Sequence, residues 1–172
     1  MIDVATLAWC AGLFEGEGSI RINKPTKRNS GALLCDVVNT DEAIVRVFNA
    51  LWPGHFRFVR AHGNRRPFFR WRIAAGDAEG FLTAIAPYLR GEKRERAALG
   101  LAFQSQKSRR TSENRTDAYA AMQWDFYERM KALNARGISV GSQLLLVPDR
   151  PSAARTCPNA AHHRKRPNNT PA

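Results

Sequence analysis

The first part of the chain combines a helical pattern with a strand pattern. Apolar side chains recur at helical spacing at Leu7, Cys10, Ala11 and Phe14. This spacing predicts a helix over residues 3–15. Ala8, Gly12 and Gly16 form a second row on the same helix, and a row of such small residues would let another helix approach closely. Polarity alternates along residues 19–24, which predicts a strand directly after the helix.

Strand patterns return three more times along the sequence. Residues 32–38, 55–60 and 68–73 are apolar or alternate apolar with basic side chains. Polar turns at residues 25–31 and 61–66 join the strands into two hairpins. Because each hairpin has one apolar and one basic face, we expect them to join in an antiparallel sheet with helices on the apolar side. The other side would present arginines, and such a twisted ribbon can lie in the major groove of DNA.

Helical patterns fill the remaining intervals. Between the hairpins, Asn39 is predicted as the N-cap of a helix and Glu42 as its capping-box partner. The apolar stripe of that helix is predicted at Ile44, Val47, Phe48 and Leu51. After the second hairpin, the pattern predicts helices from about Asp77 to Pro87 and from Lys93 to Phe103. The resulting order, α-β-β-α-β-β-α-α, predicts an α+β fold with a four-stranded antiparallel sheet.

Composition divides the chain into three parts. Residues 1–105 carry the αββαββα pattern and form the expected main domain, the part that holds the sheet. Residues 106–147 comprise a polar, basic linker and an appended helix, which we predict over residues 116–135. Residues 148–172 are rich in Pro, Asn, Ala and Arg, so we expect a disordered basic tail whose arginines and lysines contact phosphates nonspecifically.

The charge balance indicates the kind of partner. Lys and Arg number 27 against 15 Asp and Glu, which gives a net charge of +12 and a pI of about 10.6. Such a surface favours polyanions, and nucleic acid is the commonest soluble one. Residues 21–28 and 57–72 contain several basic residues and no acidic one, which argues against a basic protein that is merely soluble. The DNA-binding candidates are Arg21, Asn23, Lys24, Arg57, Arg65, Arg66, Arg70 and Arg72.

Other features bear on compartment. No segment has the run of apolar residues that crosses a bilayer, and residues 1–4 lack the basic-then-apolar layout of a signal peptide. The three cysteines are odd in number and lack metal-type spacing; they are Cys10, Cys35 and Cys157. We read them as reduced thiols with no zinc site, even though His162 and His163 follow Cys157. The expectation is a protein of the cytoplasm or of an organelle matrix, neither secreted nor bound to a membrane.

The segment with the clearest chemistry is the end of the first helix. Glu15 and Glu17 fall at a helix C-terminus, where the macrodipole disfavours each carboxylate by roughly 0.3–1 kcal/mol. Gly16 and Gly18 are expected to leave this end flexible and open. A divalent cation with oxygen ligands would compensate the negative charge. The alternative is an exposed acidic helix end with no role.

The segment Ala11–Gly18 resembles the LAGLIDADG signature of homing endonucleases, in a Glu-Gly-Glu-Gly form. The resemblance covers about residues 5–105 and departs from the pattern at Cys10, where Leu is usual. Four other segments also match, in the expected order: a basic strand, Asn39–Asp41, Phe69–Ile73, and Pro87–Leu89 leading to Lys93–Ala97. The resemblance implies a LAGLIDADG-type αββαββα endonuclease domain over residues 1–105, with a saddle-shaped antiparallel sheet and helices on one of its faces.

The resemblance also implies roles for particular residues. Glu17 would be a catalytic metal ligand for Mg²⁺ or Mn²⁺, helped by the carbonyl of Gly16. Lys93 or its neighbour Arg94 would be the active-site cation, and Thr40 would lie in the solvent network. The motif helix would form the interface of a homodimer through Ala8, Ala11, Gly12 and Glu15.

The single copy of the motif bears on assembly and activity. One subunit would cut at most one DNA strand, so the resemblance implies a homodimer that makes a metal-dependent double-strand break in a long pseudo-palindromic target. Two other functions remain open on the same scaffold: a non-catalytic DNA-binding regulator, and an RNA-binding maturase that assists intron splicing. The presence of both Glu15 and Glu17 favours the nuclease over the regulator, and the short form without a large additional basic surface favours it over the maturase.

Overall fold

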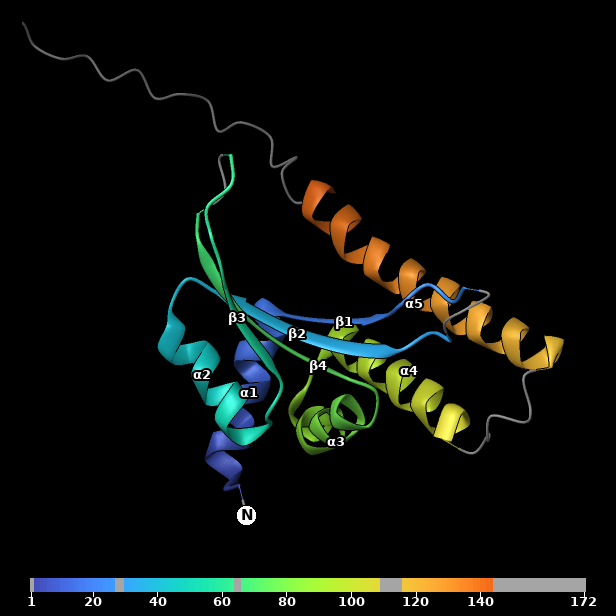
Figure 1. Cartoon of the computed structure of the whole chain (residues 1–172), viewed down its shortest axis with the longest axis horizontal. Coiled ribbons are helices and arrows are strands. Elements are labelled where there is room, and N and C mark those ends of the chain that lie inside the picture. Colours follow the sequence, from blue (N-terminus) through green and yellow to red (C-terminus); the bar gives the residue numbers. More distant parts are fainter. Residues whose placement is uncertain (1, 27–29, 64–65, 109–115, 144–172) are drawn as a thin grey trace, which may run out of the picture.

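The computed structural model describes residues 2–26, 30–63, 66–108 and 116–143 (Figure 1). Its elements follow one another as α1 (Val4–Glu17), β1 (Gly18–Ile22), β2 (Leu33–Asn39), α2 (Glu42–Leu51), β3 (His55–Val59), β4 (Phe68–Ala74), α3 (Ala75–Ile85), the 3-10 turn η1 (Ala86–Tyr88), α4 (Gly91–Ser108) and α5 (Asp117–Gln143). The predicted α+β order is confirmed. Within this described part of the chain, none of the helices combines the length and the apolar character needed to cross a bilayer.

The four strands form one antiparallel sheet in the order β1-β2-β4-β3. Helices α1 to α4 cover one face, and α5 runs past the free edge of β1 (Figure 1). The strands bury alternate side chains against the helices; these include Ile20, Ile22, Cys35, Val37, Trp71 and Ile73. The predicted alternation along the strands therefore decides which face receives the helices.

An aromatic cluster joins the helices to the centre of the sheet. The Phe81 ring of α3 lies 5.0 Å from the Phe14 ring of α1, 5.1 Å from the Trp71 ring of β4 and 4.9 Å from the Trp52 ring. Trp71 is fully buried, and its indole N–H donates a 2.8 Å hydrogen bond to the carbonyl of Trp52. Each such buried ring stabilises the fold by roughly 1.5–3 kcal/mol. The cluster fixes the direction in which α1 meets the sheet.

The predicted start of α2 is wrong. Asp41 is the N-cap, and its carboxylate accepts a 2.8 Å hydrogen bond from the Ala43 backbone N–H. Asn39 is still paired with Phe69 in the sheet, and its side chain accepts from the Asp41 N–H at 2.9 Å. The strand thus continues through the residue that the sequence pattern assigned to the cap, and Glu42 becomes the first helical residue instead of a capping-box partner.

The apolar stripe of α2 is also shifted from its prediction. Val45 and Phe48 are buried, whereas Val47 is 36 % exposed. Phe48 packs on Trp71 with the ring centres 5.3 Å apart, and this contact orients the helix. Val47 consequently faces outward beside Trp9 of α1, and both line a shallow hollow.

Helix α5 is a packing helix, longer than its pattern predicted. Phe126 and Met130 are buried, and the Phe126 ring lies 5.6 Å from Phe103 of α4. Asn134 donates a 3.2 Å hydrogen bond to the carbonyl of Ile20. Because β1 is an edge strand, this contact satisfies a backbone acceptor that no neighbouring strand can reach.

Several predictions fall outside the described residues. They concern Arg65, residues 109–115 of the linker, Cys157 with the neighbouring histidines, and the tail over residues 148–172. The linker was predicted to begin near residue 105, but α4 continues to Ser108. Cys10 and Cys35 are free and buried.

Candidate functional site

The end of α1 carries an exposed carboxylate. Glu17 is the last helical residue, and its carboxylate makes no hydrogen bond or ion pair with any residue that the structure describes. The last turn contains no basic residue that would offset the helix dipole. Gly16 is exposed, and a side chain there would meet nothing within 4 Å. This end of the helix is therefore open to a ligand.

Gly18 differs from the expectation that it would leave the helix end flexible. Its backbone is extended, with φ −82° and ψ 153°. A Cβ atom on Gly18 would lie 2.2 Å from the Phe14 ring, so the chain closes tightly on α1 at this point. The glycine is needed for this close approach, which fixes where Glu17 stands relative to β1.

Glu17 opens onto a shallow recess of about 300 Å³ at the margin of the sheet. Its lining comes from α1, from the end of β2 and from the start of β4: Glu17, Val38, Asn39, Thr40, Arg66 and Phe68. Thr40, which the resemblance assigned to a solvent network, and Arg66, a DNA-binding candidate, are thus brought to the same recess as Glu17. The recess joins a carboxylate, a hydroxyl and a guanidinium group.

Two contacts fasten the end of α1 to the start of α4. The Lys93 ammonium donates to the carbonyl of Gly18 and lies 5.5 Å from the Phe14 ring. The Glu15 carboxylate accepts from the backbone N–H of Arg90. Of the two candidate cations, Lys93 is therefore the one beside the motif, whereas Arg94 is exposed and lines another hollow with Pro87.

The surroundings of Lys93 disfavour its charge. Burial lowers the pKa of Lys93 from its ordinary value, and repulsion by Arg96 adds to this effect. Glu15 and Cys35 act in the opposite direction and raise the pKa of Lys93. A partly desolvated cation beside a carboxylate, here Glu15, is typical of functional sites.

The sheet face opposite the helices carries Arg21, Arg57, Arg70 and Arg72, and is called the arginine face below. Arg72 stands opposite Asp36 in the β2–β4 register, and Arg57 stands opposite Arg70 between β3 and β4. Directly opposed residues of antiparallel strands point to the same side, so these side chains share one face. This arrangement agrees with the alternation in the sequence.

The sequence patterns missed the carboxylate at the centre of this face. Asp36 is only 3 % exposed and forms ion pairs with Arg72 at 2.6 Å, Arg21 at 3.0 Å and Arg70 at 3.8 Å. A lone acid within the apolar strand Leu33–Asn39 was the available signal, but only the strand register shows that arginines lie on both sides of it. Asp36 pairs with three of the four arginines on this face.

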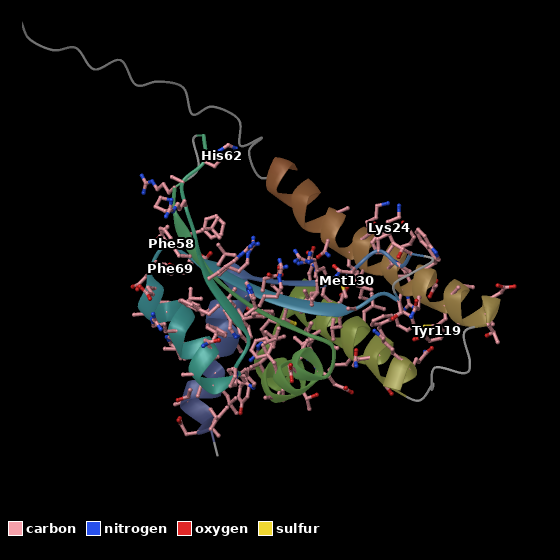
Figure 2. The ribbon with its side chains drawn as sticks, viewed as in Figure 1. Lys24, Phe58, His62, Phe69, Tyr119 and Met130 are labelled. Atoms are coloured by element: carbon pink, nitrogen blue, oxygen red, sulfur yellow. The ribbon has the colours of Figure 1, made fainter. Side chains whose placement is uncertain are left out.

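Two further DNA-binding candidates, Asn23 and Lys24, directly follow strand β1. Lys24 is exposed, and its ammonium lies 5.5 Å from the Trp124 ring of α5, at the end of the molecule far from the β3–β4 hairpin (Figure 2). Asn23 is exposed and continues the hairpin through its backbone N–H, which donates to the Ala32 carbonyl at 2.9 Å. At the opposite end, Phe58 and Phe69 pack with ring centres 5.1 Å apart.

Helix α1 exposes much of its apolar surface. Val4 is 68 % exposed and Trp9 is 45 % exposed. Ala8 and Gly12 are exposed too, and a side chain at Gly12 would meet nothing within 4 Å. Ala11, which the resemblance assigned to the dimer interface, is instead fully buried in the core of its own chain, because the Cys10–Phe14 side of the helix faces the sheet and α3.

The oxygen atoms at the end of α1 could supply part of the coordination of a metal ion. Among the described residues, no group of three or more His, Cys, Asp or Glu side chains could hold a metal ion. One chain offers the carboxylate of Glu17 beside the backbone of Gly16, both exposed. Oxygen donors of this kind suit a hard divalent cation, provided that another molecule completes the coordination.

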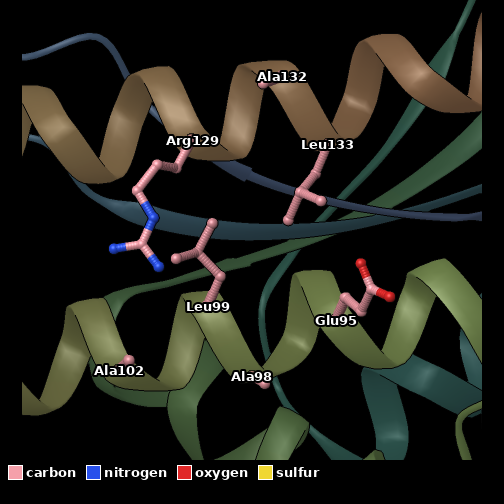
Figure 3. Close-up of a pocket in the computed structure, with 7 residues that line it drawn as sticks. All are labelled: Glu95, Ala98, Leu99, Ala102, Arg129, Ala132 and Leu133. Carbon is pink, nitrogen blue, oxygen red and sulfur yellow. The ribbon is translucent and has the colours of Figure 1, made fainter.

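A larger hollow of about 520 Å³ lies elsewhere, between α4 and α5 (Figure 3). Its walls are mainly apolar and include Ala98, Leu99 and Leu133, with Glu95 and Arg129 on facing helices. None of the candidate site residues lines it.

Comparison with solved structures gives the class of fold. The homing endonuclease I-CvuI, crystallised with the I-CreI target, matches with a TM-score of 0.61 at 16 % identity, over 75 % of this chain and 82 % of that one. The archaeal intron-encoded homing endonuclease I-Vdi141I, in complex with DNA, matches with 0.60 at 10 % identity, over 75 % and 84 %. The homing endonuclease I-TnaI matches with 0.53 at 13 % identity, over 76 % and 96 %.

The chain therefore has the fold of LAGLIDADG homing endonucleases, as the resemblance at Ala11–Gly18 implied. No family model and no curated protein matches the sequence. At these identities the similarity establishes the fold, and the roles of individual residues have to be argued from the geometry of this chain.

Proposed function

We propose that the protein is a homodimeric, divalent-metal-dependent DNA endonuclease with a site-specific target. The observation that carries this proposal is the position of Glu17. Its carboxylate has no partner among the described residues, stands at the end of an exposed apolar helix, and opens onto a recess beside the arginine face. A carboxylate that was only structural would be expected to have a cation or a cap within its own chain.

The dimer is supported by the exposed side of α1. Val4, Ala8, Trp9 and Gly12 present an exposed apolar surface, of which α2 covers only part of Trp9. Contiguous apolar surface of this kind marks interaction sites. If two copies pair through α1 about a two-fold axis, the small residues allow close approach and the two Glu17 side chains come together at the end of the seam.

The chemistry follows from this pairing. Glu17 and the Gly16 carbonyl of each copy would hold Mg²⁺ or Mn²⁺. When bound, such ions supply Lewis-acid stabilisation to a phosphodiester and lower the pKa of a coordinated water. Thr40 lines the recess and can orient water by its hydroxyl group. Lys93 holds the Gly18 carbonyl and adds positive charge where negative charge develops on the phosphate.

DNA binding is supported by the arginine face. Arg57, Arg70 and Arg72 lie on a curved antiparallel hairpin, and Arg21 lies on the neighbouring hairpin. Ribbons of this kind enter the major groove, and arginine contacts both phosphates and guanine edges there. If about 6–10 phosphates are neutralised, affinity should fall by about 10³–10⁵ between 50 and 200 mM salt.

The test is cleavage of a randomised duplex library with Mg²⁺, followed by sequencing of the ends. We expect defined double-strand breaks from the wild-type protein and none from the Glu17→Gln variant, which should still bind DNA. Glu79→Gln is the matched control, because Glu79 lies on α3 away from the recess. Binding without any cut product by the wild type would instead establish a DNA-binding regulator.

A further inference from the structure

Asp36 is the feature of the arginine face that a nuclease mechanism does not explain. The negative charge of a carboxylate weakens the attraction of this surface for phosphate. Only 4 % of the Asp36 side chain is exposed, so Asp36 cannot itself touch a base or a phosphate. Its effect on any ligand must pass through the arginines that surround it.

Two of the three arginines face Asp36 through Nε, and the third faces it through a terminal nitrogen. Arg72 donates through Nε to Oδ1 at 2.6 Å. Arg21 approaches Oδ2 through a terminal nitrogen at 3.0 Å, and Arg70 lies 3.8 Å from Oδ1 through Nε. Because Arg72 is held by Nε, both of its terminal nitrogens remain for a ligand. The Arg72 side chain is 33 % exposed, so this end of the guanidinium can meet one.

Without a carboxylate between them, these guanidinium groups would repel one another. Burial and the neighbouring cations Arg72, Arg57 and Arg21 all lower the pKa of Arg70, and Asp36 opposes them. Asp36 therefore allows several cations to stand side by side on adjacent strands. Arg57 provides the contrast, because it is exposed and makes no ion pair with any described residue.

We propose that Asp36 is the positioning residue that sets sequence specificity, by holding Arg72 ready to read a guanine in the major groove. A guanidinium that donates two parallel hydrogen bonds to O6 and N7 of guanine must be held in one orientation. A side chain that is already fixed by a carboxylate loses little freedom when it binds. This proposal rests on the proposed DNA-binding function and identifies the base class that the site recognises.

Asp36 also limits nonspecific binding. It cancels part of the positive charge of the arginine face, and phosphate attraction depends on that charge. Replacement of Asp36 by Asn keeps the size of the side chain but removes its charge and one strong acceptor. The freed arginines should then contact phosphates in any sequence, so nonspecific affinity should rise while the guanine preference falls.

The experiment has one part without DNA and one with it. In the free protein, NMR of the arginine Nε–H groups should show slow hydrogen exchange for Arg72, and Asp36→Asn should abolish this protection. Selection from a randomised duplex library, with Ca²⁺ in place of Mg²⁺, should then show a guanine preference of about 5- to 150-fold at one position of each half-site. Asp36→Asn and Arg72→Gln should each remove this preference, and combining them should remove no more.

Two variants serve as controls. Asp125→Asn makes the same change in net charge on α5, where Asp125 is exposed and pairs with Arg129 at 3.3 Å, and it should leave the selected sequence unchanged. Arg57→Gln removes an arginine that Asp36 does not hold, so it should weaken binding to all sequences alike. Arg72→Gln by itself keeps the proposal testable if Asp36→Asn does not fold.

The outcomes separate this proposal from the proposed function. Loss of the guanine preference in both Asp36→Asn and Arg72→Gln supports it. Rapid exchange of the Arg72 Nε–H in the free wild-type protein overturns the positioning role, whether or not DNA is cut. The same guanine preference in the wild type and in Arg72→Gln overturns the specificity role. A wild type that binds no duplex DNA overturns the proposed function, and the specificity role with it, even if Arg72 is held.

Discussion

The end of α1 and the middle of the arginine face each contain a carboxylate, and the two are held in opposite ways. Glu17 is exposed, follows a glycine with open space around it, and has no partner among the described residues. Asp36 is buried and pairs with three arginines. Among the described residues, the first carboxylate is unpaired, whereas the second is already surrounded by its partners.

This difference indicates what each region contributes to function. A group without partners in its own chain is available to bind an external cation, and it costs stability until it does so. A group that is paired within the chain positions its neighbours and contributes to stability. Replacing the two carboxylates should therefore have opposite effects on folding, and the predictions below test this contrast.

Glu17→Gln should give the largest effect on activity together with a small gain in stability. We expect cleavage to fall by at least about 100-fold. Loss of a residue that only supports a metal ligand costs about 10- to 100-fold in activity, and Glu17 is the proposed ligand itself. Stability should rise by about 0.3–1 kcal/mol, since the helix dipole no longer meets a negative charge. Cleavage kinetics and urea unfolding measure the two effects. A clear loss of stability would mean that Glu17 has a structural partner.

Gly12→Arg should separate the dimer without harming the subunit. The added side chain has free space in the single chain but would collide with a second α1, so we expect the mass in light scattering to halve. The monomer should unfold with a free energy about 0.5–1 kcal/mol higher, because glycine is a poor helix former. A variant that keeps the wild-type mass would exclude α1 as the seam, and a monomeric wild type would exclude the dimer.

Asp36→Asn should destabilise the protein, in contrast to Glu17→Gln. The variant weakens hydrogen bonds between charged groups, which contribute about 1.5–3 kcal/mol each when mostly buried. We expect a loss in that range by urea unfolding. Asp125→Asn, which breaks an exposed pair, should change stability by less than about 1 kcal/mol. Equal losses in both variants would contradict the distinction between buried and exposed carboxylates.

Lys93→Met should give the smallest effect on stability, and this effect should be visible in the pH dependence of the unfolding free energy. Burial lowers the pKa of Lys93 in the folded state below its ordinary value of 10.5. Between these two values the unfolded chain binds the proton and the folded protein does not, so this group makes stability rise with pH. The rise is complete above 10.5 and absent below the lowered folded value. The difference in unfolding free energy between wild type and Lys93→Met, measured from pH 8 to 11, should show this slope.

Much of the fold could be predicted from short-range patterns. The helix before Glu17, the two hairpins and the basic side of each strand follow from periodicities of 3.6 and 2. The start of α2 could not be predicted in this way, because Asn39 and Asp41 are both good N-caps. The pairing of Asn39 with Phe69 on β4 decides between them.

The sequence by itself determined that a helix ends in Glu15 and Glu17 and that basic residues alternate along the strands, because both are local properties of the chain. Only the tertiary structure decided that Asp36 stands opposite Arg72, 36 residues away, and that Lys93 reaches Gly18, 75 residues away. Strand register and helix packing are set by how the whole apolar surface is buried, and no short segment contains that information.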